Sequence, residues 1–178
     1  MAESLRNFAA AVEKLITTNR DAEQGFRAAA DAVPDGPLKK MFVELSGQRA
    51  GFASEIQDAV RKVGFEPVNP LGAAGTLHGI WISLKGSVMA NKAHVVLEEA
   101  ERGEDLAIKT YQEALPFILQ PELRSIVEKQ FAAIQASHAH IRMMRDETAP
   151  PPAEPVGPPQ HPIQPPPPPP AQPPLEKA

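Results

Sequence analysis

The feature that most constrains this sequence is the regular spacing of apolar residues over its first 33 positions. They recur at alternating steps of three and four, interrupted once by Asn19. This spacing keeps one stripe on a single side of an α-helix for about eight turns, facing partner helices. The stripe consists of Leu5, Phe8, Val12, Leu15, Asn19, Ala22, Phe26, Ala29 and Val33.

Three further amphipathic segments follow, each bounded by residues that begin or end helices. The sequence Pro-Asp-Gly-Pro at 34–37 is a turn, and Pro37 suits the first position of the next helix. Gly64 marks the end of the second helix and Pro116 the end of the third, and Pro121 begins the last helix. We therefore predict an all-α antiparallel four-helix bundle, with later helices over 37–63, 91–115 and from 121 onwards.

The connection over residues 65–90 is longer than a simple up-down-up-down bundle needs. A crossover of this length makes the second and third helices parallel. We expect it to carry a short amphipathic helix of its own, formed around Leu77, Ile80, Trp81, Leu84 and Val88.

Composition changes sharply near Thr148. Proline accounts for 15 of the 30 residues in 149–178, but for only 6 of the preceding 148. The tail lacks the apolar residues that a core requires. We predict a folded domain over 1–148 and a disordered proline-rich tail over 149–178, whose run of six prolines favours a stiff polyproline II spacer.

Charge and composition argue against two classes of partner, nucleic acids and membranes. The net charge is −4 without a basic stripe, which argues against nucleic acid. The sequence has no cysteine, no apolar signal-peptide region and no apolar run near the ~20 residues that span a bilayer. We expect a cytoplasmic protein that is independent of membranes.

Polar residues interrupt the apolar stripe of each helix at a similar height. With the second and third helices parallel, four of them fall roughly 15 Å from one end of the bundle. These four are Glu23, Gln48, Glu101 and His138, and further polar residues near this level are Glu44, Glu104 and Gln135.

Carboxylate and imidazole groups at one level suit one divalent cation per chain, such as Fe, Mn or Zn. Two buried glutamates without a cation would be costly. Three glycines near the belt, Gly25, Gly47 and Gly103, suggest close backbone approach or an open cavity. The predicted ligands are Glu23, Glu101 and His138, with Glu104 and Glu44 as alternates and Gln48 and Gln135 as weak oxygen donors or supporting groups.

The alternative interpretation of the belt needs no metal. Glu101 and Glu104 could pair with Arg49, Arg102 or Lys39 in a salt-bridge network that sets the register of the helices. A lone histidine beside an apolar stripe is commonly a hydrogen-bonded structural residue. Tyr111 is then simply part of the packed core.

Several stretches resemble a bacterial family of small four-helix proteins of unknown function in the ferritin-like superfamily. The similarity runs from about Leu5 to Asp146, and it implies a ferritin-like antiparallel bundle but no settled activity. It is carried by Asn-Arg-Asp-Ala-Glu-Gln-Gly-Phe at 19–26, Glu-Leu-Ser-Gly-Gln-Arg at 44–49, Leu-His-Gly-Ile-Trp at 77–81 and Glu-Arg-Gly-Glu-Asp at 101–105.

The sequence departs from the ferritin di-iron pattern, which needs Glu-x-x-His on the second and fourth helices. The second helix has no histidine, and the fourth offers Gln135 in place of glutamate before His138. We therefore favour a bundle without assigned catalytic residues that binds one metal, in metal handling or stress protection. The alternatives are an interaction protein that self-associates or docks a protein partner through its tail and, third, a di-iron oxidase or ferroxidase.

Overall fold

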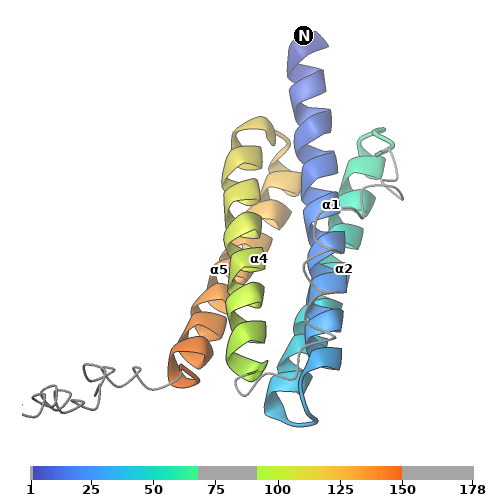
Figure 1. The fold of residues 1–178 in the computed structure, drawn as a ribbon. Coiled ribbons are helices and arrows are strands. Elements are labelled where there is room, and N and C mark those ends of the chain that lie inside the picture. The colour runs from blue at the N-terminus through green and yellow to red at the C-terminus, as the bar shows by residue number, and fades with distance from the viewer. Residues whose placement is uncertain (1, 68–91, 150–178) are drawn as a thin grey trace, which may run out of the picture.

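Four long helices dominate the computed structural model, which describes residues 2–67 and 92–149 (Figure 1). The predicted bounds of the first three helices and the start of the fourth are confirmed to within three residues. The short helix expected in the 65–90 connection and the tail from 150 onwards lie outside the described residues. The elements are α1 (Ala2–Ala32), α2 (Pro37–Lys62), α4 (Lys92–Ala114), the short 3₁₀ helix η1 (Leu115–Phe117) and α5 (Pro121–Glu147).

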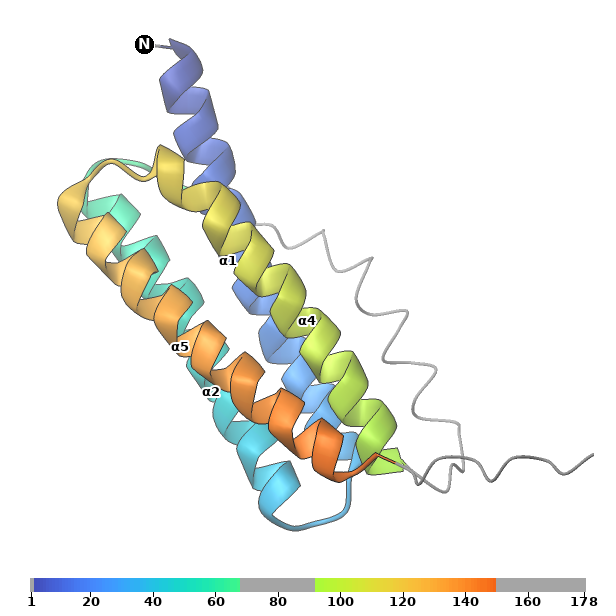
Figure 2. The same cartoon turned by 90° about the vertical axis from the view of Figure 1, so that its left-hand side faces the viewer.

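The directions of the helices confirm the predicted topology. Helices α2 and α4 run the same way, while α1 and α5 run opposite to them (Figures 1 and 2). Helix α1 packs against α2 and α4, and α5 packs against α4 and α2. The start of α1, the end of α2, the end of α4 and the start of α5 therefore share one end of the bundle.

Helix α2 ends at Lys62, and Gly64 stops it two residues later, as the sequence predicts. Gly64 has a φ of 80°, in the left-handed region that glycine adopts without strain. Its N–H donates to the carbonyl of Arg61 (2.9 Å), and the N–H of Phe65 donates to that of Val60 (3.0 Å). This pair of bonds is a Schellman motif. It directs the Phe65 ring onto Phe8, with centroids 5.6 Å apart.

The apolar core consists of two clusters stacked along the bundle axis. One surrounds Leu15, Ile56 and Tyr111. The other surrounds Phe26, Phe42 and Leu97. Buried polar side chains occupy the level between them. In the described helices, no segment is long and apolar enough to cross a lipid bilayer.

Candidate functional site

A layer of buried polar side chains divides the two apolar clusters, at the level where the sequence predicts a polar belt. All four long helices contribute to it. Burying so many polar groups is tolerable only where each finds a partner, so the pairings define what the layer can do. Its buried members are Asn19, Ser46, Arg49, Glu101 and Glu104, while the buried Thr110 and Gln130 lie at the level of the first cluster.

The centre of the layer is an ion pair between α2 and α4. The Nη2 atom of Arg49 lies 2.8 Å from both carboxylate oxygens of Glu104, and the two side chains are 0% and 1% exposed. The Ser137 hydroxyl on α5 accepts a hydrogen bond from Arg49 Nη2 (2.8 Å). The same hydroxyl donates a hydrogen bond to Glu104 Oε2 (2.7 Å). Three helices are thus joined through one carboxylate that is already charge-compensated.

The rest of the Arg49 guanidinium is surrounded by aromatic faces. Its central carbon lies 5.8 Å from the Phe26 ring centroid and 5.4 Å from that of Phe52. These are cation–π distances. The Nε and Nη1 atoms of Arg49 are buried without a hydrogen-bond partner in the described structure. The positive charge is therefore held by one carboxylate, one hydroxyl and two rings.

A second chain of hydrogen bonds leads from the layer into the first cluster through Tyr111. Asn19 Nδ2 donates to the Tyr111 hydroxyl (2.7 Å), which donates to Gln130 Oε1 (2.8 Å). Gln130 Nε2 in turn donates to Glu55 at 2.8 Å. Asn19 also donates to the Leu15 carbonyl, 2.9 Å away. The chain links α1, α4, α5 and α2 without a cation.

Burial raises the pKa of Tyr111 above its ordinary value, despite the hydrogen bond from Asn19. The folded protein therefore retains the phenol proton at a pH where the unfolded chain loses it, and stability falls as pH rises above about 10. Tyr111 is the only tyrosine, so phenolate absorbance reports it alone. We expect that absorbance to appear together with the loss of helical circular dichroism. Phenolate formation in a still-folded protein would contradict the buried placement.

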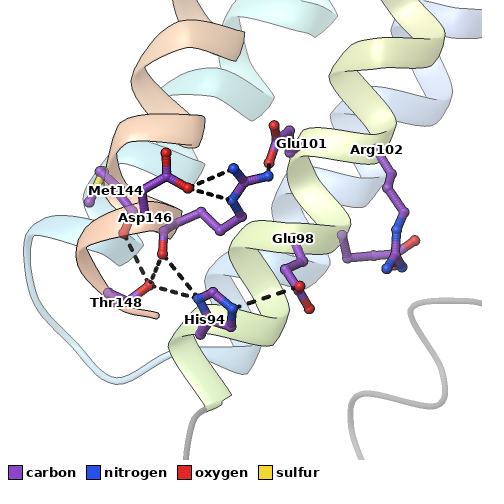
Figure 3. A network of polar contacts seen from close by, with 9 residues as sticks. His94, Glu98, Glu101, Arg102, Met144, Asp146 and Thr148 are labelled. Carbon is purple, nitrogen blue, oxygen red and sulfur yellow. Dashed lines mark hydrogen bonds and ion pairs between the residues drawn. The ribbon is translucent and has the colours of Figure 1, made fainter. Parts of the chain in front are cut away.

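The edge of the layer, between α4 and α5, holds two further predicted ligands, Glu101 and His138. Glu101 forms an ion pair with Arg145, which also bonds Asp146 (Figure 3). His138 Nε2 lies 2.9 Å from Asp105 Oδ1 and 3.9 Å from Glu101 Oε1. The neighbouring carboxylate of Asp146 raises the pKa of Arg145, as does Glu101. This edge is only partly buried, unlike the Arg49 centre.

Figure 3 shows that the same edge continues to the end of α5. His94 Nδ1 lies 3.0 Å from the Arg145 backbone carbonyl and 3.4 Å from the Thr148 hydroxyl. The Thr148 hydroxyl donates to the Met144 carbonyl at 3.0 Å. His94 therefore caps the carboxyl end of α5 rather than completing the polar layer.

The structure does not assemble the seven predicted ligands into one site. Glu23 pairs with Arg20 and Arg27 at the surface of α1. Glu44 and Gln135 are exposed. The reason is helix rotation: successive residues differ by about 100° in direction, so neighbours in sequence face different sides. The predicted ligands are therefore distributed over the core, the α4–α5 edge and the surface, and metal binding by them stays a prediction.

The charge-pair alternative is confirmed for Arg49 and Glu104. It is wrong for the two other cations that the sequence offered, because Arg102 pairs with Glu99 (2.6 Å) and Lys39 with Asp35 (2.6 Å). Sequence reasoning missed the roles of Ser137, Arg145 and Asp105. The sequence did contain a signal for two of them. Ser137 and Arg145 both lie on α5, the helix that faces the core glutamates Glu104 and Glu101.

The glycines near the belt do not mark close helix contacts at the positions that can be checked. A Cβ at Gly47 or Gly103 would meet no atom within 4 Å. Gly103 and Gly25 line an open groove between α1 and α4 together with Ala22, Phe26 and Ala100. The open-cavity interpretation of these residues therefore holds for Gly103.

The core layer does not fit the di-iron centre that its architecture suggests. Such a centre needs carboxylates free to bind cations and a Glu-x-x-His pair on α2, and α2 contains no histidine. Here a guanidinium lies against Glu104, and among residues 2–67 and 92–149 two of the four unpartnered buried polar side-chain atoms are Arg49 donors. Gln48 Oε1 is a buried acceptor left without a partner. No group of three or more His, Asp or Glu in the described ranges is arranged to hold a metal.

The topology and the polar layer define a ferritin-like four-helix bundle. In agreement, the fold is similar to that of a solved point mutant of Dps1 from Mycobacterium smegmatis. The TM-score is 0.62 at 13% sequence identity, over 82% of this chain and 99% of that one. No curated protein matches the sequence.

Residues 7–116 match the family described as "Domain of unknown function (DUF2383)". The chain belongs to this family. The match covers α1, α2 and α4 and stops before α5, so two of the three helices of the Arg49 centre lie inside the family region.

Proposed function

We propose that this protein is a non-catalytic interaction protein built on a ferritin-like bundle whose core carries its own cation. The observation that supports this most is the fully buried pair of Arg49 and Glu104. In a bundle that binds metal through its core, that carboxylate would be available to the ion. Here it serves to hold three helices in register.

A chelation experiment tests this proposal. A protein that gains folding free energy from a metal loses stability when the metal is removed. We expect the melting temperature of natively purified protein to be unchanged after exhaustive chelation, and unchanged again after anaerobic addition of Fe²⁺, Mn²⁺ or Zn²⁺. A drop on chelation that metal reverses, and that Glu104→Gln abolishes, would contradict an arginine-compensated core.

A second candidate function rests on the α4–α5 edge. The ferritin-like fold is compatible with metal handling or stress protection, and His138 lies beside two carboxylates, those of Asp105 and Glu101. These three side chains are not arranged around a common metal position in the described structure, so one divalent Fe, Mn or Zn ion would have to draw them together and displace Arg145 from Glu101. This site would retain two of the predicted direct ligands, Glu101 and His138.

Arg145 offers a sharp test of the edge site. If the site binds metal, Arg145→Gln removes a competing cation and tightens Zn²⁺ binding in a calorimetric titration. His138→Ala weakens it by about 10- to 100-fold, because one of three ligands is lost. Glu23→Gln is the matched control and leaves binding unchanged, since Glu23 is paired on α1. A Zn²⁺ affinity that is the same in the parent, the Arg145→Gln variant and the His138→Ala variant would exclude this site.

A docking role for the proline-rich tail is a further part of the interaction proposal. The tail composition favours a stiff spacer between the bundle and the chain terminus. A partner lost on truncation after Ala149, with the helical signal preserved, would support it. A partner that binds the truncated chain equally well would assign binding to the bundle itself.

A further inference from the structure

An apolar groove lies between α1 and α4, which pack side by side in the bundle (Figures 1 and 2). It is open because two of its lining residues are glycines, and a Cβ at Gly103 would meet no described atom within 4 Å. Leu106 borders it with 47% of its surface exposed. The apolar and small residues that line this α1–α4 groove are Ala22, Gly25, Phe26, Ala100, Gly103 and Leu106.

Two acidic side chains also line the groove, Asp21 from α1 and Glu99 from α4. Glu99 is already paired with Arg102 (2.6 Å). Asp21 forms no ion pair within residues 2–67 and 92–149, and partial burial raises the pKa of its carboxyl. An opposite charge would stabilise that carboxylate. The groove is therefore suited to an apolar stripe that carries a single cation beside it.

The two ends of the connection between α2 and α4 lie at opposite ends of the bundle. The described chain stops at Pro67, just after α2, and resumes at Lys92, where α4 begins. Because α2 and α4 are parallel and α4 has 23 residues, these points are separated by about 35 Å along the bundle axis. Residues 68–91 must therefore pass along the side of the bundle.

Two observations favour the side of α1 over the side of α5. Helices α1 and α5 each pack against both α2 and α4, so the connection passes over one of them. The Phe65 ring lies on Phe8 of α1, with centroids 5.6 Å apart, so the chain leaves α2 in the direction of α1. The α4–α5 edge, by contrast, carries charged side chains, among them Arg145 and Asp146.

We propose that residues 77–85 of the connection bind in the α1–α4 groove, with the apolar stripe on its walls and Lys85 paired with Asp21. The stripe consists of Leu77, Ile80, Trp81 and Leu84, at the spacing of one helix face. Lys85 directly follows Leu84, so it lies about 100° from it and flanks the stripe. It is also the only Lys, Arg, Asp or Glu in 68–91.

Covalent connection favours this segment over a separate partner. A segment tethered on both sides of the groove has a high effective concentration there, so it binds in preference to a free chain of similar chemistry. The family match over residues 7–116 includes both helices of the groove and the segment itself. The inference goes beyond the proposed interaction function, because it assigns this side of the bundle to the chain itself.

Trp81 is the only tryptophan, so its fluorescence in the full chain reports the segment directly. We expect short-wavelength emission and weak quenching by acrylamide in the parent. Gly103→Phe fills the groove and should move the emission to longer wavelength and increase quenching by about two-fold or more, as for a segment released to solvent. Gly47→Phe is the matched control: its Cβ also meets no described atom within 4 Å, but Gly47 lies on α2. Circular dichroism verifies that both variants keep the parental helicity.

Charge reversal tests the ion pair without filling the groove. Asp21→Lys places two lysines together, and it should release Trp81 as Gly103→Phe does. Adding Lys85→Glu restores opposite charges and should return the emission and the quenching to the parental values. General loss of folding would not be rescued by a second charge reversal, so the rescue is specific to this pair.

A Trp81 that is fully exposed to water in the folded parent would overturn the inference. A buried Trp81 whose emission is the same in the parent, in Gly103→Phe and in Asp21→Lys would also overturn it, because the segment would then lie against another surface. Neither result concerns the core ion pair of Arg49 and Glu104. The chelation experiment can therefore fail while this inference stands, or the reverse.

Discussion

Replacing Arg49 with methionine is expected to destabilise the bundle by about 3–5 kcal/mol. Methionine fills a similar path between Phe26 and Phe52, but it leaves the Glu104 carboxylate buried without its cation. For a domain of this size the loss corresponds to a melting temperature lower by roughly 10–15 °C. Urea denaturation followed by circular dichroism at 222 nm measures it.

Two comparisons separate charge compensation from packing at this position. The double variant Arg49→Met, Glu104→Leu should recover most of the lost stability. In it an apolar pair of similar volume replaces the charged pair, and no buried carboxylate is left without a partner. Arg27→Met is the surface control and should change stability by less than about 0.5 kcal/mol, since Arg27 is 71% exposed in its pair with Glu23. If Arg49→Met alone were as mild as Arg27→Met, Arg49 would not compensate Glu104.

Replacing Tyr111 with phenylalanine should cost about 1–3 kcal/mol. The substitution keeps the ring, which stacks on Phe131 with centroids 6.3 Å apart, and removes only the hydroxyl. Asn19 then loses an acceptor and Gln130 a donor, and both side chains are buried. The free energy of unfolding from urea titration is the measurement.

A double-mutant cycle assigns that cost to the hydrogen-bond chain. In the background of Asn19→Leu, the further change Tyr111→Phe should cost less than it does alone, because one of the orphaned groups has already been removed. Additive costs would show that the hydroxyl does not act through Asn19.

Apolar periodicity was sufficient to predict the helices, and the length of the connection over 65–90 was sufficient to predict their parallel and antiparallel order and hence the height of the polar layer. All of these depend on spacing along the chain. The pairings within the layer depend instead on the rotation of each helix about its own axis. Gln48 and Arg49 are adjacent in sequence but differ by about 100° in direction, and the structure places Arg49 at the centre.

Arg49 also shows why a buried cation is hard to predict from sequence. Arginine is almost never fully buried unless paired, so an arginine beside an apolar stripe is ordinarily assigned to the surface. Its long apolar stem lies between two phenylalanines while its head meets Glu104. The carboxylates were identifiable from their stripe positions, and the partner that compensates Glu104 became evident only in three dimensions.

The ferritin-like fold and the chemistry of its core are thus separable in this protein. The helices, the crossover topology and a mid-core polar layer are those of the class. The layer nevertheless uses a guanidinium, a hydroxyl and a phenol where a di-iron protein uses carboxylates and imidazoles.

The central claim is that Arg49 is the cation of the core, and elemental analysis of natively purified protein tests it most directly. The parent chain and the Glu104→Gln and His138→Ala variants should be measured together, before and after anaerobic loading with Fe²⁺, Mn²⁺ or Zn²⁺. We expect no metal whose binding depends on Glu104. Metal that is lost only in His138→Ala would belong to the α4–α5 edge. Near-stoichiometric metal that disappears in a folded Glu104→Gln protein would contradict the account.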